Sequence, residues 1–249
     1  MRPMEIRPPF GYKDIVPLNR TQKVRLLRPG EIPEFARKLN SIPISYTEFG
    51  VVAREYPIVF AATPGAPASY APVAVLGMAA DENLYDAGGS WAGGVYIPAY
   101  ARRFPFCMAK VQLDKVEQQN RLICVEKSHI DEAGEALFDV KGQPGEKWTE
   151  IERLLREYEA DLERSREMCA ILADYSLLEP FTMQAKLAKG GNPIALTGIH
   201  RVAESRIEHL NASQLKNLVK KGILSRIYAH LLSLDNFARL LDRKAARAA

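Results

Sequence analysis

The sequence predicts an α+β fold in which a sheet-rich N-terminal half is followed by a long amphipathic helix, a β-hairpin and C-terminal helices. Three features predict it: a run without charge from Tyr56 to Ala80, a helical stripe of apolar and small residues from Trp148 to Leu172, and two apolar segments flanking the turn sequence AKGGN. Strand and helix patterns do not alternate strictly, so a doubly wound parallel sheet is not expected.

The overall composition is that of a globular protein. Hydrophobic residues make up 47% of the 249 residues and charged residues 26%, which allows a core of its own. We therefore expect one domain over residues 1–249, with a subdivision near residues 142–147 as the alternative. The cysteines, Cys107, Cys124 and Cys169, are odd in number and widely spaced. This pattern predicts neither a disulfide framework nor a zinc site, and it favours a reducing compartment, the cytoplasm.

The segment before the uncharged run is expected to be extended and then helical. Residues 1–30 are rich in proline and charge, with strand-like pieces such as VRLL and no apolar stretch of the kind found in secretory signal peptides. EIPEFARKL predicts a short helix. YTEFGVVAREY predicts another, which ends before Pro57 because a residue that precedes proline is disfavoured in the helical region.

The uncharged run is long enough to span a bilayer, but its prolines exclude a membrane helix. Pro57, Pro64, Pro67 and Pro72 would break the backbone hydrogen bonding that lipid demands. We expect instead two buried strands, IVFAAT and VAVLGM, joined by the turn-rich PGAPASYAP. The glycine-rich loop AGGSWAGG follows, and then FPFCMAKVQ and RLICVEK, which also have strand composition.

The clearest helix covers residues 148–172. Its stripe recurs in steps of three and four residues, at Trp148, Ile151, Leu155, Tyr158, Leu162, Ser165, Cys169 and Leu172. A single helix and two shorter ones both fit this pattern. The stripe either covers the protein's own sheet, which we favour, or pairs with a second copy in a homodimer.

The C-terminal part is predicted to be a hairpin followed by helices. FTMQAKL and PIALTGIH flank AKGGN as hairpin strands, and Asn211 with Gln214 forms a capping box that starts a helix ending near Gly222. A second helix is expected from about Leu224, and a third from Ser233 or Asp235 through Leu241.

Basic charge is concentrated at this end. Residues 211–249 hold eight Lys and Arg against two Asp and Glu, which is a net charge of +6, whereas the chain as a whole has +4. The outline resembles a helix-turn-helix, but the second helix has few polar groups to read bases, so we expect no nucleic-acid partner.

No motif in the sequence specifies a reaction. The sequence contains no GxGxxG, GxxxxGK[ST] or GxSxG pattern, which excludes the commonest nucleotide-binding and hydrolase signatures. His129 and Asp131 form an H-x-D pair that, with the distal His200, would supply the two-histidine, one-carboxylate set of a non-haem iron oxygenase. This is the enzyme alternative; because H-x-D also arises by chance, the main expectation is a protein without a cofactor.

The best candidate binding surface is the segment GSWAGGVYIPAYARRFPF, residues 89–106. Its large aromatic rings and its arginines are the residue types enriched where proteins bind partners, and arginine can hold an anionic group. The candidate residues are Trp91, Tyr96, Tyr100, Arg102 and Arg103. The alternative is a short helix from Pro98 with one face in the core, in which an arginine pairs with an acid such as Glu82 and the two adjacent arginines point apart.

Three stretches carry a family resemblance. ENLYDAGGSWAGGVYIPAYARRFPF, YTEFGVVAREYPIVF and LTGIHRVAESRIEHLNASQLKNLVKKGILSRIYAHLLSLDNFARLL resemble the SapC family of bacterial proteins in order and spacing. The resemblance implies a link to bacterial surface layers and brings no catalytic residues with it. With no export signal in the sequence, we expect a cytoplasmic accessory protein that binds a protein or peptide partner and serves the export or modification of other proteins. A structural surface-layer component is the alternative.

Overall fold

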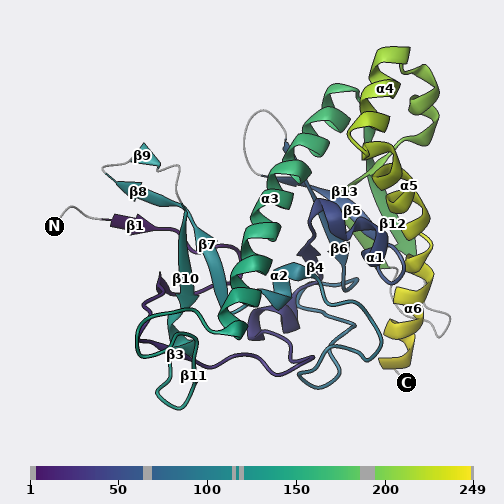
Figure 1. Ribbon diagram of the computed structural model, residues 1–249. Coiled ribbons are helices and arrows are strands. Elements are labelled where there is room, and N and C mark those ends of the chain that lie inside the picture. Colours follow the sequence, from purple (N-terminus) through teal and green to yellow (C-terminus); the bar gives the residue numbers. More distant parts are fainter. Residues whose placement is uncertain (1–3, 64–68, 114–115, 118–120, 186–193, 248–249) are drawn as a thin grey trace.

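The computed structural model describes residues 4–63, 69–113, 116–117, 121–185 and 194–247. Its centre is a five-stranded antiparallel sheet (Figure 1). The strands lie in the order β12 (Leu178–Ala185), β13 (Ile194–Val202), β5 (Ile58–Thr63), β6 (Ser69–Val75) and β4 (Ser41–Pro43). The α+β class is confirmed, and so are the two strands expected in the uncharged run and the two strands of the hairpin. The AKGGN turn lies outside the described residues.

Helices pack along this sheet. The longest, α3 (Glu146–Asp174), contacts β6, and α5 (Ile223–Ser233) contacts β5 and β13. Between them lies the short α1 (Phe49–Val52), as Figure 1 shows. The expected helix at YTEFGVVAREY is thus divided: Tyr46–Glu48 is a 3-10 turn, and α1 is one turn long.

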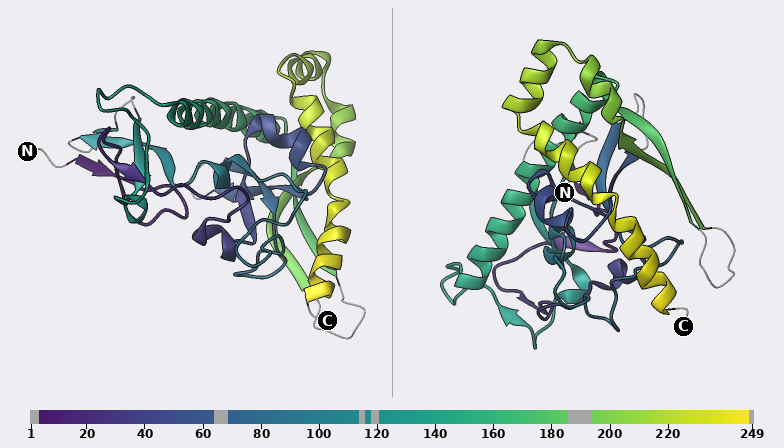
Figure 2. Two further views of the ribbon diagram at one scale, coloured as in Figure 1. Left: turned by 60° about the horizontal axis from the view of Figure 1, so that its bottom comes forward. Right: turned by 90° about the vertical axis from the view of Figure 1, so that its right-hand side faces the viewer.

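The N-terminal half contains three smaller sheets. One has the order β2–β10–β7, another β1–β8–β9, and the third pairs β11 with β3. Figure 2 shows this half and the five-stranded sheet from two further directions. The bounds of these elements are β1 (Met4–Ile6), β2 (Ile15–Pro17), β3 (Lys23–Val24), β7 (Phe106–Ala109), β8 (Val111–Leu113), β9 (Val116–Glu117), β10 (Leu122–Glu126) and β11 (Glu135–Ala136).

Helix α3 joins the two halves. It is one unbroken helix of 29 residues, about 43 Å long at 1.5 Å per residue. Trp148 and Leu155 belong to the core of the N-terminal half, whereas Cys169 and Leu172 belong to the core of the five-stranded sheet. Every position of the predicted stripe is buried or partly buried within the chain. A homodimer through residues 148–172 stays a prediction.

The C-terminal helices follow the expected capping chemistry. The capping box of Asn211 and Gln214 is present at α4 (Ala212–Lys220), and Gly222 takes a left-handed conformation with φ of 70° between α4 and α5. The last helix, α6 (Asn236–Arg247), extends beyond the predicted end at Leu241. Within the described residues, no helix has the length and apolar character needed to cross a membrane.

Strand β6 begins and ends earlier than the predicted VAVLGM, since it covers Ser69–Val75. The sequence placed Ser69 to Pro72 in a turn, yet they pair with β5, with Ser69 opposite Thr63 and Pro72 opposite Phe60. Proline is tolerated in a strand where its missing N–H would not face a ladder partner. The backbone of Pro72 faces the β4 side, because its carbonyl accepts from the Ile44 N–H at 3.2 Å. The missing N–H of Pro72 therefore removes no hydrogen bond between β6 and β5.

A buried histidine closes the sheet between β5 and β13. These strands pair directly at Ile199 opposite Ala61 and His200 opposite Phe60. At Ile58 and Val202, two positions further in the same register, the imidazole of His230 lies between the strands. Its Nε2 accepts from the Val202 N–H at 3.0 Å, and its Nδ1 donates to the Ile58 carbonyl at 2.8 Å. This arrangement requires the neutral ring, and burial lowers the pKa of His230 to about 4.

We therefore expect stability to fall in acid. The unfolded chain binds a proton at His230 near pH 6.5, but the native state does so only near pH 4, so the contribution is complete above pH 6.5 and is lost as pH falls toward 4. The loss in the free energy of unfolding is about 3 kcal/mol. Urea unfolding at several pH values measures it. His230→Gln should make the free energy of unfolding less dependent on pH in this range. His209→Gln, at an exposed histidine, should leave this dependence unchanged.

Candidate functional site

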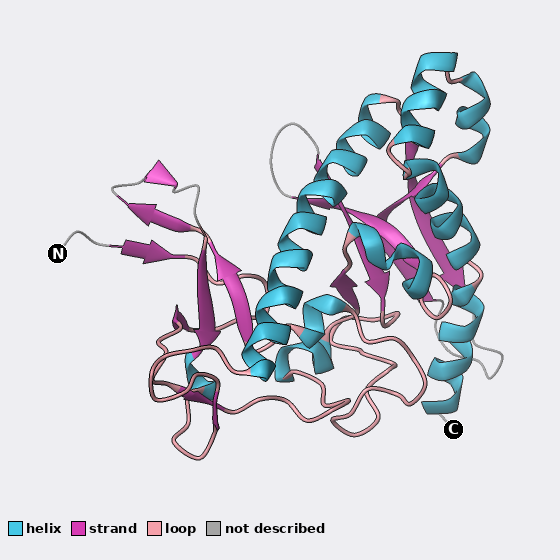
Figure 3. Cartoon of the chain, in the orientation of Figure 1, coloured by secondary structure: helices cyan, strands magenta, loops and turns pink. Residues whose placement is uncertain are grey.

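The aromatic–arginine segment, residues 89–106, runs through loop and a single helical turn, α2 (Ala99–Arg102), and ends at the first residue of β7. It belongs to the long loop-rich stretch between β6 and β7 (Figure 3). Trp91 is buried, and its Nε1 donates to the Tyr56 hydroxyl at 2.6 Å. That hydroxyl donates in turn to the Tyr96 carbonyl at 2.6 Å. Trp91 therefore anchors the segment to the chain that precedes β5.

A buried carboxylate organises the same segment. Glu48 accepts from the Ala99 N–H at 2.6 Å and from the Tyr96 hydroxyl at 3.0 Å. Its other oxygen accepts from the Ser45 backbone and hydroxyl, which completes a capping box. Our sequence reasoning missed Glu48, although the pattern Ser45-x-x-Glu48 signals a helix start. Its second role, as the acceptor for Ala99, depends on contacts between distant parts of the chain.

The two adjacent arginines point to different surroundings. Arg102 lies at the surface, where its guanidinium donates to the Ile97 carbonyl at 2.9 Å and to the Tyr96 hydroxyl at 2.8 Å. Arg103 is only 3% exposed and stacks on the rings of Tyr100 at 4.1 Å and Tyr158 at 4.8 Å. This divergence is expected for neighbours on a helical turn.

The acid that faces Arg103 is Glu159 of α3, at 3.7 Å. Glu82, which the sequence suggested as an arginine's partner, pairs with Lys244 of α6. Tyr100 is also buried, and its hydroxyl donates to the Phe10 carbonyl at 2.6 Å. The structure thus brings the five candidates into two groups: Trp91, Tyr96 and Arg102 in one, and Tyr100 and Arg103, which contact α3 and the turn around Phe10, in the other. A partner-binding role for them stays a prediction.

The candidate iron ligands are not brought together as a set. Both ring nitrogens of His129 contact Arg25, one its carbonyl and one its guanidinium, each at 2.8 Å. Burial lowers the pKa of His129. Asp131 accepts from the Ala133 N–H in its own turn, and His200 lies on β13 against the ring of Tyr70. In the part of the chain that the structure describes, no group of three His, Cys, Asp or Glu residues is placed to hold a metal ion.

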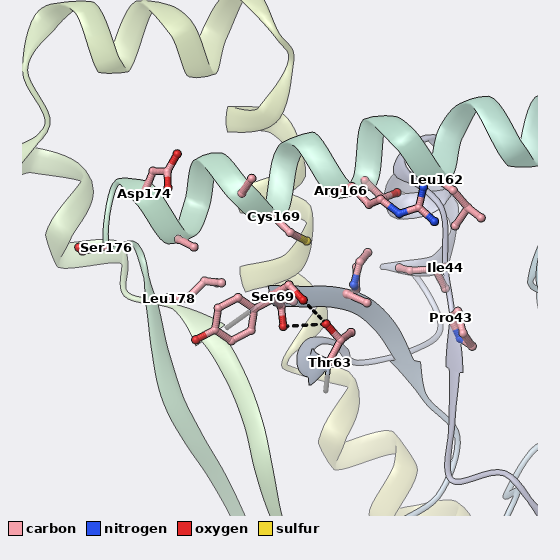
Figure 4. Close-up of a pocket in the computed structure, with 16 residues that line it drawn as sticks. Pro43, Ile44, Thr63, Ser69, Leu162, Arg166, Cys169, Asp174, Ser176 and Leu178 are labelled. Atoms are coloured by element: carbon pink, nitrogen blue, oxygen red, sulfur yellow. Dashed lines mark hydrogen bonds between the residues drawn. The ribbon is translucent and has the colours of Figure 1, made fainter. Parts of the chain in front are cut away.

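A cleft of about 900 Å³ lies between the C-terminal half of α3 and the end of β6 (Figure 4). Many of the side chains on both walls are small, so they do not fill the space between α3 and β6. Residues of α3 that line it include Leu162, Ser165, Cys169, Ala170 and Ala173; residues of the strands and their connections include Pro43, Ile44, Thr63, Ser69, Tyr70, Ala71 and Leu178. The sequence did not predict this cleft. Its small residues indicate a helical stripe on α3 but do not indicate a space beside that helix.

The floor of the cleft includes an open strand edge. β4 pairs with β6 only from Val73 to Val75, and the Ile44 N–H adds one bond to Pro72. Backbone groups alternate sides along a strand, so Tyr70 presents its N–H and C=O on the same side as Pro72. No strand among the described residues pairs with β6 on that side of Tyr70. Unpaired edge groups are a template for another strand.

The lining of the cleft includes one cysteine and two charged side chains. Burial raises the pKa of the Cys169 thiol to about 12, so the thiol stays protonated and is a poor nucleophile at neutral pH. Arg166 and Asp174 provide opposite charges near the cleft. Arg166 forms an ion pair with Glu163, one turn earlier on α3.

Comparison with known proteins identifies the family. The family model described as SapC matches residues 20–240, which include both the cleft and the aromatic–arginine segment. The chain belongs to the SapC family. No curated protein and no solved structure matches this chain. For this SapC protein, the roles of individual residues therefore rest on the geometry described above.

The two arginines of this SapC chain should respond differently to substitution. Arg103→Ala leaves Glu159 without one of its cations in a buried setting and opens a gap among three tyrosines, so it should lower the free energy of unfolding by about 3 kcal/mol. Arg102→Ala removes surface contacts and should cost less than about 1 kcal/mol. Chemical denaturation of both variants measures the difference; equal losses would contradict the assignment of Arg103 to the core.

Proposed function

We propose that this SapC protein is a peptide-binding accessory protein that holds an extended segment of another protein in the cleft between α3 and β6. The observation that carries the proposal is the open edge of β6 at Tyr70, which faces a cleft of about 900 Å³. That volume lies in the range of ligand-binding pockets. A pocket next to free backbone donors and acceptors suits a ligand that is itself a polypeptide.

The mode of binding is strand addition. An extended peptide would pair with the N–H and C=O of Tyr70 and continue the sheet at the point where β4 turns away after Pro43. Alternate side chains of the peptide would then point toward α3. The small residues there, such as Ala170 and Ala173, leave room for apolar side chains of moderate size.

The residues that line the cleft favour binding over catalysis. The Cys169 thiol has a raised pKa, and no histidine is among the described residues that line the cleft. An accessory role in a surface layer, or in the export or modification of other proteins, requires recognition of polypeptides before they have folded or assembled. The buried free thiols of Cys107, Cys124 and Cys169 are compatible with action in the cytoplasm.

Filling the cleft should weaken peptide binding. Ala170 and Ala160 are both exposed on α3, but only Ala170 lines the cleft. Selection from a phage-displayed library of linear peptides should yield binders, and Ala170→Trp should weaken their binding by at least about tenfold because the indole occupies the ligand's space. The matched control, Ala160→Trp, should bind as the wild type does. Failure to select any binder, or equal binding by both variants, would overturn the proposal.

The strand edge can be tested separately from the cleft. Tyr70→Pro removes the outward N–H, whereas Tyr70→Ala removes only the side chain. Because the proline variant loses one backbone hydrogen bond, its affinity for the selected peptides should be about fivefold to tenfold lower than that of the alanine variant. Isothermal titration of both variants measures this, and circular dichroism verifies that both are folded. If the two variants bind equally, the peptide does not pair with β6.

A further inference from the structure

The helical pair α4–α5 exposes large apolar side chains to solvent. On α4, Leu215 is 40% exposed and Val219 is 58% exposed; on α5, Tyr228 is 43% exposed and Leu232 is 72% exposed. Each pair is spaced by four residues and so lies on one face of its helix. Figure 1 shows α4 at one extremity of the molecule, away from the smaller sheets. Apolar side chains gathered at such a place commonly mark a contact site.

Basic side chains accompany this apolar surface. Residues 211–234 contain Lys216, Lys220, Lys221 and Arg226 and no acidic residue. Lys221 pairs with Glu167, and Arg226 stacks on the ring of Tyr46 at 4.2 Å. Lys216 and Lys220 are exposed, and no hydrogen bond or ion pair to them is found among the described residues. These two lysines follow directly after Leu215 and Val219, so that apolar and basic stripes lie side by side on α4.

We propose that the exposed face of α4 docks this protein on an anionic membrane surface. Exposed apolar residues beside unpaired lysines are the composition of helices that lie in a lipid interface, and each lysine near an anionic surface adds to the affinity. A second copy of the chain is a poorer occupant, because the same lysines would face each other. An acidic protein is also less suited, since α4 lies at an extremity of the molecule, where an extended flat surface can reach it. The inference does not rest on the peptide-binding proposal.

The test uses the full chain and vesicles of defined composition. Sedimentation should show binding to vesicles of phosphatidylglycerol mixed equally with phosphatidylcholine, little binding to phosphatidylcholine alone, and weaker binding as salt is raised. The double variant V219S/K220E should reduce binding by about tenfold or more. The sequence offers a matched control in V140S/K141E, which alters another exposed Val-Lys pair, far along the chain.

The outcomes are distinct. If V219S/K220E loses binding to anionic vesicles while V140S/K141E binds them as the wild type does, the proposal is supported. Equal binding of the wild type to anionic and neutral vesicles, or unchanged binding by V219S/K220E, overturns it. If the wild type ignores all vesicles while V219S/K220E loses capture of an acidic protein from its own cells, the face is a protein-docking surface and the membrane proposal is wrong. Circular dichroism and urea unfolding verify that both variants are folded, and these measurements do not depend on any ligand.

Discussion

The imidazole of His230 between β5 and β13 is the interaction on which the arrangement of the C-terminal half depends. The described ladder contains only two directly opposed residue pairs between these strands, so the hairpin of β12 and β13 would be weakly joined to the rest of the sheet without it. His230 links the Ile58 carbonyl to the Val202 N–H, and Ser233, one turn later, accepts from the Ile58 N–H at 2.9 Å. Both side chains are fully buried. A helix thus completes the hydrogen bonding of a strand pair, which fixes α5 relative to the sheet.

A second constraint joins the two halves of the molecule. Helix α3 contributes to both cores, and Arg103 is held against it by Glu159 and Tyr158. Removing a charge from water is costly unless it is paired, so this buried arginine is stable only where α2 and α3 meet. Glu48 has the corresponding role for the loop before α2, where it accepts from Ala99. The aromatic–arginine segment thus meets α3, the chain around α1 and the N-terminal strands at one junction.

Local patterns explain which parts of this fold could be predicted. The stripe of α3, the hairpin strands and the Asn211 cap each depend on residues close in sequence, and each is present in the structure. The early start of β6 was missed because Pro72 reads as a turn residue, and only the position of β4 shows which side its nitrogen faces. The cleft was missed for a related reason. Its walls come from α3 and β6, far apart in the sequence, and small residues indicate a space only once their elements are known to face each other.

The exposed helical pair contacts the end of α3, close to the cleft. Asn217 of α4 donates to the Tyr175 hydroxyl at 2.9 Å, and Lys221 pairs with Glu167 of α3. Tyr175 follows Asp174, and Glu167 follows Arg166; both Asp174 and Arg166 line the cleft. Helix α4 and the residue that follows it are therefore held against the helix that forms one wall of the cleft. Taken together, the two proposals describe a protein that holds an extended polypeptide close to a membrane surface, which is where a segment awaiting export or assembly into a surface layer would be found.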